Sequence, residues 1–209
     1  MRATPFGRYL LLDEIARGGM ARVYRALLRT APSFERPVAL KRVLLEFCDD
    51  TEFVRRFGDE AAIASTLSHG NIVQVFDFGE VDGEYYLTME LVDGPDLATL
   101  LAASDGLLPL PAALFIGAGV GRGLGAAHKR RDEAQRPRPV IHRDVSPHNV
   151  LLTRAGEVKV ADFGIAKASG RLLSTRPGQV LGKVRYMSPE QARGGAIDVR
   201  SDVYSLGAV

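Results

Sequence analysis

The sequence predicts an α+β protein in two parts, a β-rich first part with one helix and a helical second part. In residues 1–93, short apolar runs alternate with turn residues, and one longer run has helical spacing. After Asp93-Gly94-Pro95 the character of the sequence changes, and two segments, residues 97–101 and 111–128, have helical spacing. The 209 residues are 46% hydrophobic and 25% charged, which suits a globular chain that buries a sizeable core. We therefore expect a boundary near Asp93, between residues 1–93 and 94–209.

The chain begins with three predicted strands. Residues 9–15 and 23–28 are short apolar runs on either side of a glycine-containing turn, which predicts a hairpin. Residues 37–41 predict a third strand, with its proline at the start because proline cannot donate to a strand ladder.

A helix and two further strands complete the first part. Residues 51–68 predict the helix, because apolar residues and one glutamate recur there every three or four positions. These positions are Phe53, Phe57, Glu60, Ala64 and Leu67. Residues 72–78 and 85–91 predict the strands, with a turn over residues 81–84.

The second part is predicted to begin with two helices, over residues 97–101 and 111–128. The second of them is rich in glycine, so we expect it to depend on packing more than on helix propensity. Residues 130–139 are charged and contain proline, which predicts a solvated surface loop.

Composition excludes several classes of protein. A net charge of +2 is too small for a nucleic-acid-binding surface, so we expect no nucleic-acid partner. Cys48 is the only cysteine, which excludes a disulfide framework and a thiolate zinc site. We expect a reducing, cytoplasmic environment.

No membrane segment is expected within these residues. The N-terminus lacks a signal-peptide pattern, and the longest uncharged stretch, residues 106–121, contains two prolines and is too short to span a bilayer. The sequence ends at Val209 inside an apolar pattern without a helix stop signal, so we expect a fragment of a longer chain. An anchor beyond Val209 stays an open alternative.

The glycine-containing turn between the first two strands is a candidate phosphate-binding loop. No G-x-x-x-x-G-K-[ST] pattern is present, which excludes a P-loop NTPase. A strand, not a helix, follows the glycines, which excludes a dinucleotide-binding βαβ unit. A phosphate-covering loop and a plain β-turn both remain possible at this point.

Lys41 is a second candidate, because only five of the 27 basic residues are lysines. Its compact ammonium could pair with phosphates while Glu60, on the inward face of the predicted helix, holds it in place. The alternative is a solvated charge at the end of a strand and an exposed glutamate on a helix.

The strongest signal is the run Ile141-His142-Arg143-Asp144-Val145-Ser146-Pro147-His148-Asn149, followed by Asp162-Phe163-Gly164 and Ser188-Pro189-Glu190. Asp144, Asn149 and Asp162 supply hard oxygen ligands and a proton acceptor. Mg²⁺ prefers a few such ligands, with phosphate oxygens and water completing its octahedron.

With these motifs in this order, the chain resembles the eukaryotic-type (Hanks-type) serine/threonine protein kinases of bacteria over nearly its whole length. The resemblance implies a bilobal kinase fold, with a nucleotide-binding N-lobe and a C-lobe that is incomplete at its C-terminus. It implies ATP- and Mg²⁺-dependent transfer of the γ-phosphoryl group to serine or threonine hydroxyls of protein substrates, in signalling. Residues 198–207 resemble the start of the central C-lobe helix, whose Asp202 would brace the His-Arg-Asp loop. The oligomeric state is not indicated.

The resemblance also implies roles for the candidate residues. Lys41, paired with Glu60, would hold the α- and β-phosphates, and Asp144 would accept the proton of the substrate hydroxyl. Asn149 and Asp162 would bind Mg²⁺.

Nucleotide contacts follow from the same resemblance. The loop would cover the phosphates, with Val23 over the adenine. Ala39 and Leu151 would enclose the adenine ring, and Met89 would be the gatekeeper. Backbone groups of Glu90 and Val92 would form hydrogen bonds with the adenine edge. The loop residues are Ile15, Ala16, Arg17, Gly18, Gly19, Met20, Ala21, Arg22 and Val23.

Four positions depart from the family pattern. Ala16 and Ala21 stand where glycines are usual, and their methyl groups would hold the loop away from the phosphates unless φ is negative there. Ser146 stands where serine/threonine kinases usually carry lysine, and Lys183 stands where threonine is usual. We interpret these two as a reciprocal exchange in which Lys183 is the catalytic ammonium, the alternative being an ordinary exposed lysine.

Two alternatives to an active protein kinase remain. A catalytically weak nucleotide-binding scaffold, similar to a pseudokinase, would account for the missing glycines and lysine. A small-molecule phosphotransferase shares the Asp-x-x-x-x-Asn pattern, but it normally lacks the long segment that ends in Ser-Pro-Glu.

Overall fold

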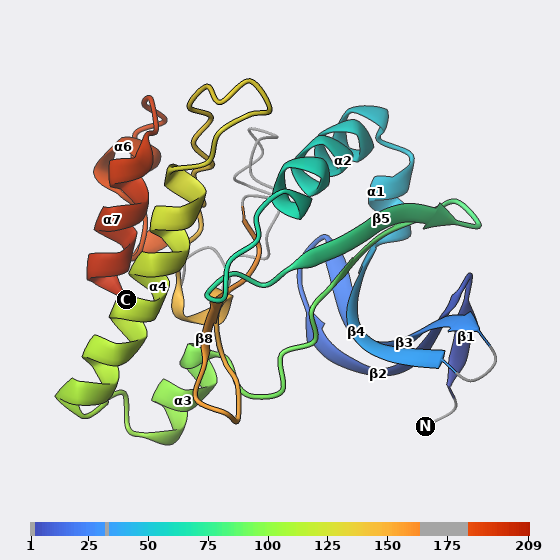
Figure 1. The fold of residues 1–209 in the computed structure, drawn as a ribbon, viewed down its shortest axis with the longest axis horizontal. Coiled ribbons are helices and arrows are strands. Elements are labelled where there is room, and N and C mark those ends of the chain that lie inside the picture. Colours follow the sequence, from blue (N-terminus) through green and yellow to red (C-terminus); the bar gives the residue numbers. More distant parts are fainter. Residues whose placement is uncertain (1–2, 32–33, 164–183) are drawn as a thin grey trace. The chain divides into compact units, whose positions relative to one another are not determined.

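The computed structural model describes residues 3–31, 34–163 and 184–209, and these form two compact units (Figure 1). One unit contains the described residues of Met1–Thr66 together with Gln74–Leu91. The other contains Leu67–Val73 and the described residues from Val92 onward. The chain therefore passes into the second unit, returns to the first, and leaves it again after Leu91.

The first unit is built on a six-stranded antiparallel sheet in the order β1-β2-β3-β4-β6-β5 (Figure 1). The strands are β1 Thr4–Phe6, β2 Tyr9–Arg17, β3 Ala21–Ala31, β4 Phe34–Val43, β5 Val75–Val81 and β6 Glu84–Met89. Five of them are predicted by the sequence with shorter or shifted ends. The sequence does not predict β1, because three residues are too few for an alternating pattern to show.

Pro37 lies inside β4, so the prediction that it starts the strand is wrong. It stands opposite Leu27 of β3, whereas β4 pairs with β6 only from Ala39 onward. Before Ala39, β4 thus has a strand neighbour on one side only. Pro37 lies in this stretch, and its missing N–H breaks no hydrogen bond on the unpaired side.

The predicted turn between the last two strands is confirmed. Asp82 and Gly83 link β5 to β6, and both have positive φ, 50° and 80°. A two-residue hairpin turn of this kind favours Asp-Gly, because its twist matches that of the strands. The predicted start of β5 at residue 72 is wrong, since Ile72 instead bridges Val160 in the second unit.

Two helices, α1 Leu45–Cys48 and α2 Thr51–Ser65, follow β4. The side chain of Asp50 caps α2 by accepting hydrogen bonds from the amides of Glu52 (3.1 Å) and Phe53 (3.0 Å). The helix ends three residues before the predicted end, because Leu67 packs in the core of the second unit.

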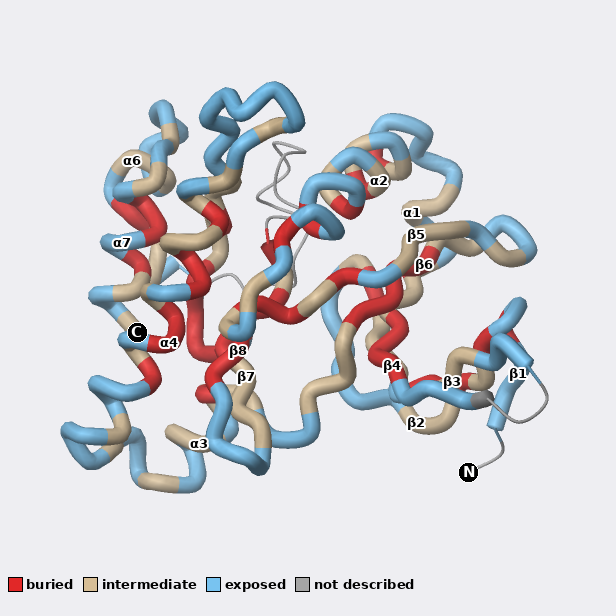
Figure 2. The backbone as a smooth tube through the Cα atoms, in the orientation of Figure 1, coloured by how far each residue is buried: buried red, intermediate tan, exposed pale blue. Residues whose placement is uncertain are grey.

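Figure 2 shows buried stretches of backbone in the sheet of the first unit, and several buried apolar residues of this sheet form one cluster. Its members are Phe6, Tyr9, Leu11, Ala26, Val38, Leu40 and Tyr86.

The second unit is mostly helical (Figure 1). Its elements are α3 Leu97–Ala103, α4 Leu110–His128, the 3₁₀ turn η1 Pro147–Asn149, the hairpin β7 Val150–Leu152 and β8 Val158–Val160, α6 Pro189–Ala192 and α7 Val199–Ala208. The two predicted helices correspond to α3 and α4, and the predicted start of the central helix corresponds to α7. Helix α4 packs against both β8 and α7, so it forms the centre of this unit.

The glycines of α4 mark its closest contacts. A Cβ atom on Gly119 would lie 2.7 Å from Cβ of Val158, and one on Gly123 would lie 2.6 Å from the carbonyl oxygen of Asn71. These contacts show that the helix is closely packed, and its dependence on that packing stays a prediction. Within the described ranges, α4 alone is long and apolar enough to cross a membrane by length and composition, which by itself is weak evidence for a membrane segment.

Candidate active site

The residues predicted to contact the nucleotide from the sheet share one of its faces. Val23 on β3 lies opposite Lys41 on β4, and Ala39 lies opposite Met89 on β6. Ala39 and Lys41 are two residues apart on one strand, so their side chains point to the same face. The strand register therefore brings these four residues together.

The two alanines of the glycine-containing loop fit the backbone without strain. Ala16 lies in β2 opposite Val23, and Ala21 lies in β3 opposite Val43. Neither alanine has a positive φ, so a methyl group is compatible with the strand conformation at both positions. The turn between them is closed by a 2.9 Å hydrogen bond from the amide of Gly18 to the carbonyl of Ala21.

Glu90 is anchored at the end of β6. Its amide donates to the carbonyl of Gln74 at 2.8 Å, and its carboxylate accepts from the amide of Gln74 at 3.3 Å. In a hydrogen bond between the backbone of this residue and an adenine edge, the carbonyl of Glu90 would therefore be the acceptor. Lys41 on β4 and Glu60 on α2 both belong to the first unit, and their pairing stays a prediction.

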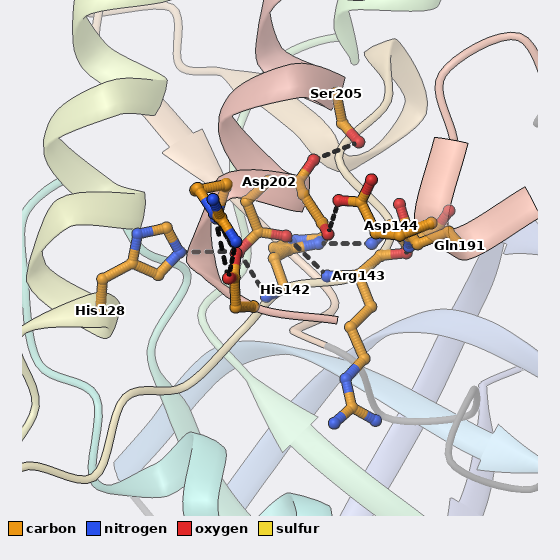
Figure 3. Close-up of polar contacts among 11 residues, drawn as sticks. His128, His142, Arg143, Asp144, Gln191, Asp202 and Ser205 are labelled. Carbon is orange, nitrogen blue, oxygen red and sulfur yellow. Dashed lines mark hydrogen bonds and ion pairs between the residues drawn. The ribbon is translucent and has the colours of Figure 1, made fainter. Parts of the chain in front are cut away.

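In the second unit, one buried carboxylate holds the backbone of the His-Arg-Asp loop (Figure 3). Asp202 on α7 is 1% exposed and accepts hydrogen bonds from the amides of His142 (2.8 Å) and Arg143 (2.9 Å). The bracing role expected for Asp202 is thereby confirmed. Nε2 of His128 on α4 lies 2.7 Å from the same carboxylate, and nothing in the sequence predicts this third contact.

His142 is fully buried and neutral. Its Nδ1 accepts a hydrogen bond from the amide of Asp144 at 3.1 Å, and its Nε2 donates to the carbonyl of Ala161 at 2.9 Å. One donor and one acceptor describe the uncharged imidazole. Burial also lowers the pKa of His142 below its ordinary value, because removal from water disfavours the charged form. The ring packs 4.6 Å from that of Phe163.

Arg143, the residue before Asp144, has a φ of 66°. This left-handed conformation is rare for a residue with a side chain. The carbonyl of Arg143 accepts a 2.9 Å hydrogen bond from Nε2 of Gln191 on α6, a contact that the sequence did not predict (Figure 3).

One candidate metal ligand, Asn149, is held beside the candidate proton acceptor. Nδ2 of Asn149 donates to the carbonyl of Asp144 at 2.8 Å, so the amide oxygen of Asn149 is the atom available to a cation. The carbonyl of Asn149 accepts from the amide of Ala161 at 2.9 Å, which ties the loop to the residue before Asp162.

The oxygen donors of Asn149 and Asp162 fit the preferences of Mg²⁺. Asn149 and Asp162 offer oxygen ligands, and the described part of the chain contains no group of three or more His, Cys, Asp or Glu side chains that could hold a metal ion. Mg²⁺ is commonly bound through one or two carboxylates plus substrate phosphates and water. The residues present suit a cation that arrives with a nucleotide.

The segment after Val92 is attached closely to β7, the strand that contains Leu151. The amide of Leu152 donates to the carbonyl of Pro95 at 3.0 Å, and a Cβ atom on Gly94 would lie 1.9 Å from the carbonyl oxygen of Leu152. Only glycine allows this approach. In the sequence, Gly94-Pro95 indicated only a boundary.

Of Ser146 and Lys183, the two positions in the proposed exchange, only Ser146 lies among the described residues. It is 1% exposed, and its hydroxyl oxygen has no hydrogen-bond partner among the residues that the structure describes. Lys183 lies outside the described residues, so the exchange stays a prediction.

The chain belongs to the protein kinase domain family, whose model matches residues 9–209. It is 46% identical to the tyrosine-protein kinase MasK of Myxococcus xanthus and 42% identical to the serine/threonine-protein kinase PrkC of Bacillus subtilis, over 97% of this chain in each case. The kinase domain of PknI from Mycobacterium tuberculosis is 32% identical, with a TM-score of 0.73 over 98% of this chain and 72% of that chain. The predicted kinase fold is confirmed. The chain spans about a third of the curated relatives, 32% of MasK and 30% of PrkC.

Proposed function

We propose that this chain transfers the γ-phosphoryl group of ATP to hydroxyl groups of protein substrates, with Mg²⁺, in bacterial signalling. The observation that carries the proposal is the hydrogen bond from Asn149 to the carbonyl of Asp144, which joins the candidate metal ligand to the candidate proton acceptor in one turn. Phosphoryl transfer depends mainly on positioning and charge stabilisation, so a rigid link between these two groups suits it.

Asp144 is the proton acceptor in this proposal. Its carboxylate takes the proton of the substrate hydroxyl as the oxygen bonds to phosphorus, and the leaving oxygen stays on ADP. Asn149 and Asp162 would hold Mg²⁺, which when bound neutralises charge on the β- and γ-phosphates. The braced backbone around Asp144 keeps its carboxylate from having to reorganise during the reaction.

The sheet residues would bind the nucleotide. Lys41, held by Glu60, pairs its ammonium with the α- and β-phosphates, and the loop around Gly18 covers them. Val23, Ala39 and Leu151 would enclose the adenine, with Met89 as the gatekeeper. Backbone groups of Glu90 and Val92 would form hydrogen bonds with the adenine edge. Support comes from the shared face of Val23, Ala39, Lys41 and Met89 on the sheet.

Serine or threonine is the acceptor that we propose, as the name of PrkC states for that relative. Tyrosine is a second candidate, because Ser146 replaces the usual lysine of serine/threonine kinases and the relative MasK is named a tyrosine kinase. The comparisons offer no support for the scaffold alternative. We place the activity in the cytoplasm, where ATP is available.

The test uses Asp144→Asn, assayed with labelled ATP and a general protein substrate. Loss of the proton acceptor is expected to lower turnover by about 10²- to 10⁴-fold while ATP still binds. Asp105→Asn is the matched control, because Asp105 is exposed and its positive φ of 53° is tolerated by asparagine. Phosphoamino-acid analysis of the product distinguishes serine and threonine from tyrosine. Near-normal turnover of Asp144→Asn would overturn the proposal.

A further inference from the structure

The peptide group between Arg143 and Asp144 is held at both of its ends. Its carbonyl, from Arg143, accepts from Nε2 of Gln191 at 2.9 Å, and its N–H, from Asp144, donates to Nδ1 of His142 at 3.1 Å (Figure 3). The preceding N–H, from Arg143, donates to Asp202 at 2.9 Å. Side chains therefore fix the rotation of the peptide that leads into Asp144.

Gln191 is oriented for this contact by its own helix. Its Oε1 accepts from the amide of Ser188 at 3.1 Å, and its backbone amide donates to Oγ of Ser188 at 3.4 Å, which together form the capping box of α6. Because the amide oxygen is engaged by Ser188, the amide nitrogen points the other way, toward Arg143.

Helix capping alone does not require the amide nitrogen of Gln191. A glutamate at the third helical position completes a capping box equally well, because only an acceptor is needed. The additional N–H group reaches across 48 positions of sequence to Arg143, a residue with a left-handed φ of 66°. A donor at this carbonyl opposes the return of Arg143 to an ordinary conformation.

We propose that Gln191 is a positioning residue for Asp144, an inference that rests on the proposed phosphoryl transfer. Its hydrogen bond keeps the Arg143–Asp144 peptide rotated so that the carboxylate of Asp144 reaches the substrate hydroxyl. Gln191 touches neither substrate nor nucleotide in this role, and it acts through the backbone of Arg143.

The test compares Gln191→Glu, Gln191→Met and the control Ser188→Ala in the purified protein. Glutamate keeps the acceptor for Ser188 but, when ionised, has no hydrogen to donate to Arg143. We expect kcat to fall about tenfold or more at neutral pH, with the KM for ATP within about twofold of the parent, because a lost hydrogen bond of this kind corresponds to such a factor.

The pH profile separates positioning from a merely structural role. As the pH falls and the carboxyl of Gln191→Glu becomes protonated, its O–H can donate to the carbonyl of Arg143, so the ratio of variant to parent activity should rise. The side chain of Gln191→Met has no donor at any pH, so the ratio of its activity to that of the parent should stay low and should not change with pH. Ser188→Ala loses one half of the capping box but spares the bond to Arg143, and its kcat should stay within about twofold of the parent.

Hydrogen exchange supplies a readout that does not depend on activity. Amides of residues 142–149 should exchange faster in Gln191→Met than in the parent, while those of α4 should not change. A kcat within twofold of the parent in both Gln191 variants, or exchange unchanged in residues 142–149, would overturn the inference. A parent protein without phosphoryl transfer would instead overturn the proposed function, and the exchange experiment would still decide the positioning role.

Discussion

Replacing Gly123 on α4 with alanine should expose how tightly the helix is packed. A Cβ atom at this position would lie 2.6 Å from the carbonyl oxygen of Asn71, closer than such atoms approach in real proteins. That carbonyl cannot move cheaply, because it accepts a 2.9 Å hydrogen bond from the amide of Val160 on β8. Gly125, two residues further along the same helix, is the matched control, since its Cβ position has no described atom within 4 Å apart from its chain neighbours and the nearby backbone of its own helix.

Two opposing effects set the magnitude. Alanine in place of glycine stabilises a helix interior by about 0.5–1 kcal/mol, and this gain applies to both variants. Overpacking costs about 1–3 kcal/mol, and it applies only to Gly123→Ala. We therefore expect Gly125→Ala to be more stable than the parent, and Gly123→Ala to be less stable than Gly125→Ala by about 1–3 kcal/mol. For a domain of this size that difference corresponds to about 2–12 °C in Tm.

Urea unfolding followed by circular dichroism measures the difference between the two variants. Displacement of Asn71 also disturbs Val160, two residues before Asp162, so Gly123→Ala should lose phosphoryl transfer while Gly125→Ala keeps it. Equal stability of the two variants would refute the argument that contact with Asn71 demands glycine at this position.

Two further predictions concern the proposed exchange of Ser146 and Lys183, and the buried His142. Lys183→Ala should lower kcat much more than it raises the KM for ATP, because the proposed role of its ammonium is to act on the phosphoryl group during transfer. Ser146→Ala should change kcat only slightly. An unchanged kcat in Lys183→Ala would make Lys183 an ordinary exposed lysine. Burial lowers the pKa of His142, so below about pH 6.5 the unfolded chain binds a proton that the folded chain excludes, and stability should fall as the pH decreases from there. Urea unfolding of the parent and of His142→Gln from about pH 8 to about pH 5 tests this, and the same pH dependence in both would contradict it.

Local signals in the sequence predicted local structure well. The Asp82-Gly83 turn could be recognised because its chemistry lies within two adjacent residues. The end of α2 could not, because Leu67 continues the helical spacing of Phe57 and Ala64 although it belongs to the core of the second unit. Periodicity reports that a side chain is buried, and it does not report which core receives it.

The candidate site divides in the same way. Asp144, Asn149 and Asp162 stand within motifs, so the sequence identified them as candidates through a family resemblance. The contacts that hold the loop come from single residues far away, such as His128, 74 positions from its partner Asp202. A lone histidine has many possible roles, and only the fold reveals which partner it meets.

The costs of this arrangement lie in folding and not in the reaction. A buried carboxylate such as Asp202 is expensive unless donors surround it, and here the amides of His142 and Arg143 and the ring of His128 serve as those donors. The left-handed Arg143 adds a cost of about 1–3 kcal/mol. The packing of α4, α6 and α7 around the loop offsets both unfavourable contributions during folding, before any substrate binds. The backbone at Asp144 can relax only if hydrogen bonds to several elements break together, so in the proposed reaction its carboxylate would not have to reorganise when a hydroxyl arrives.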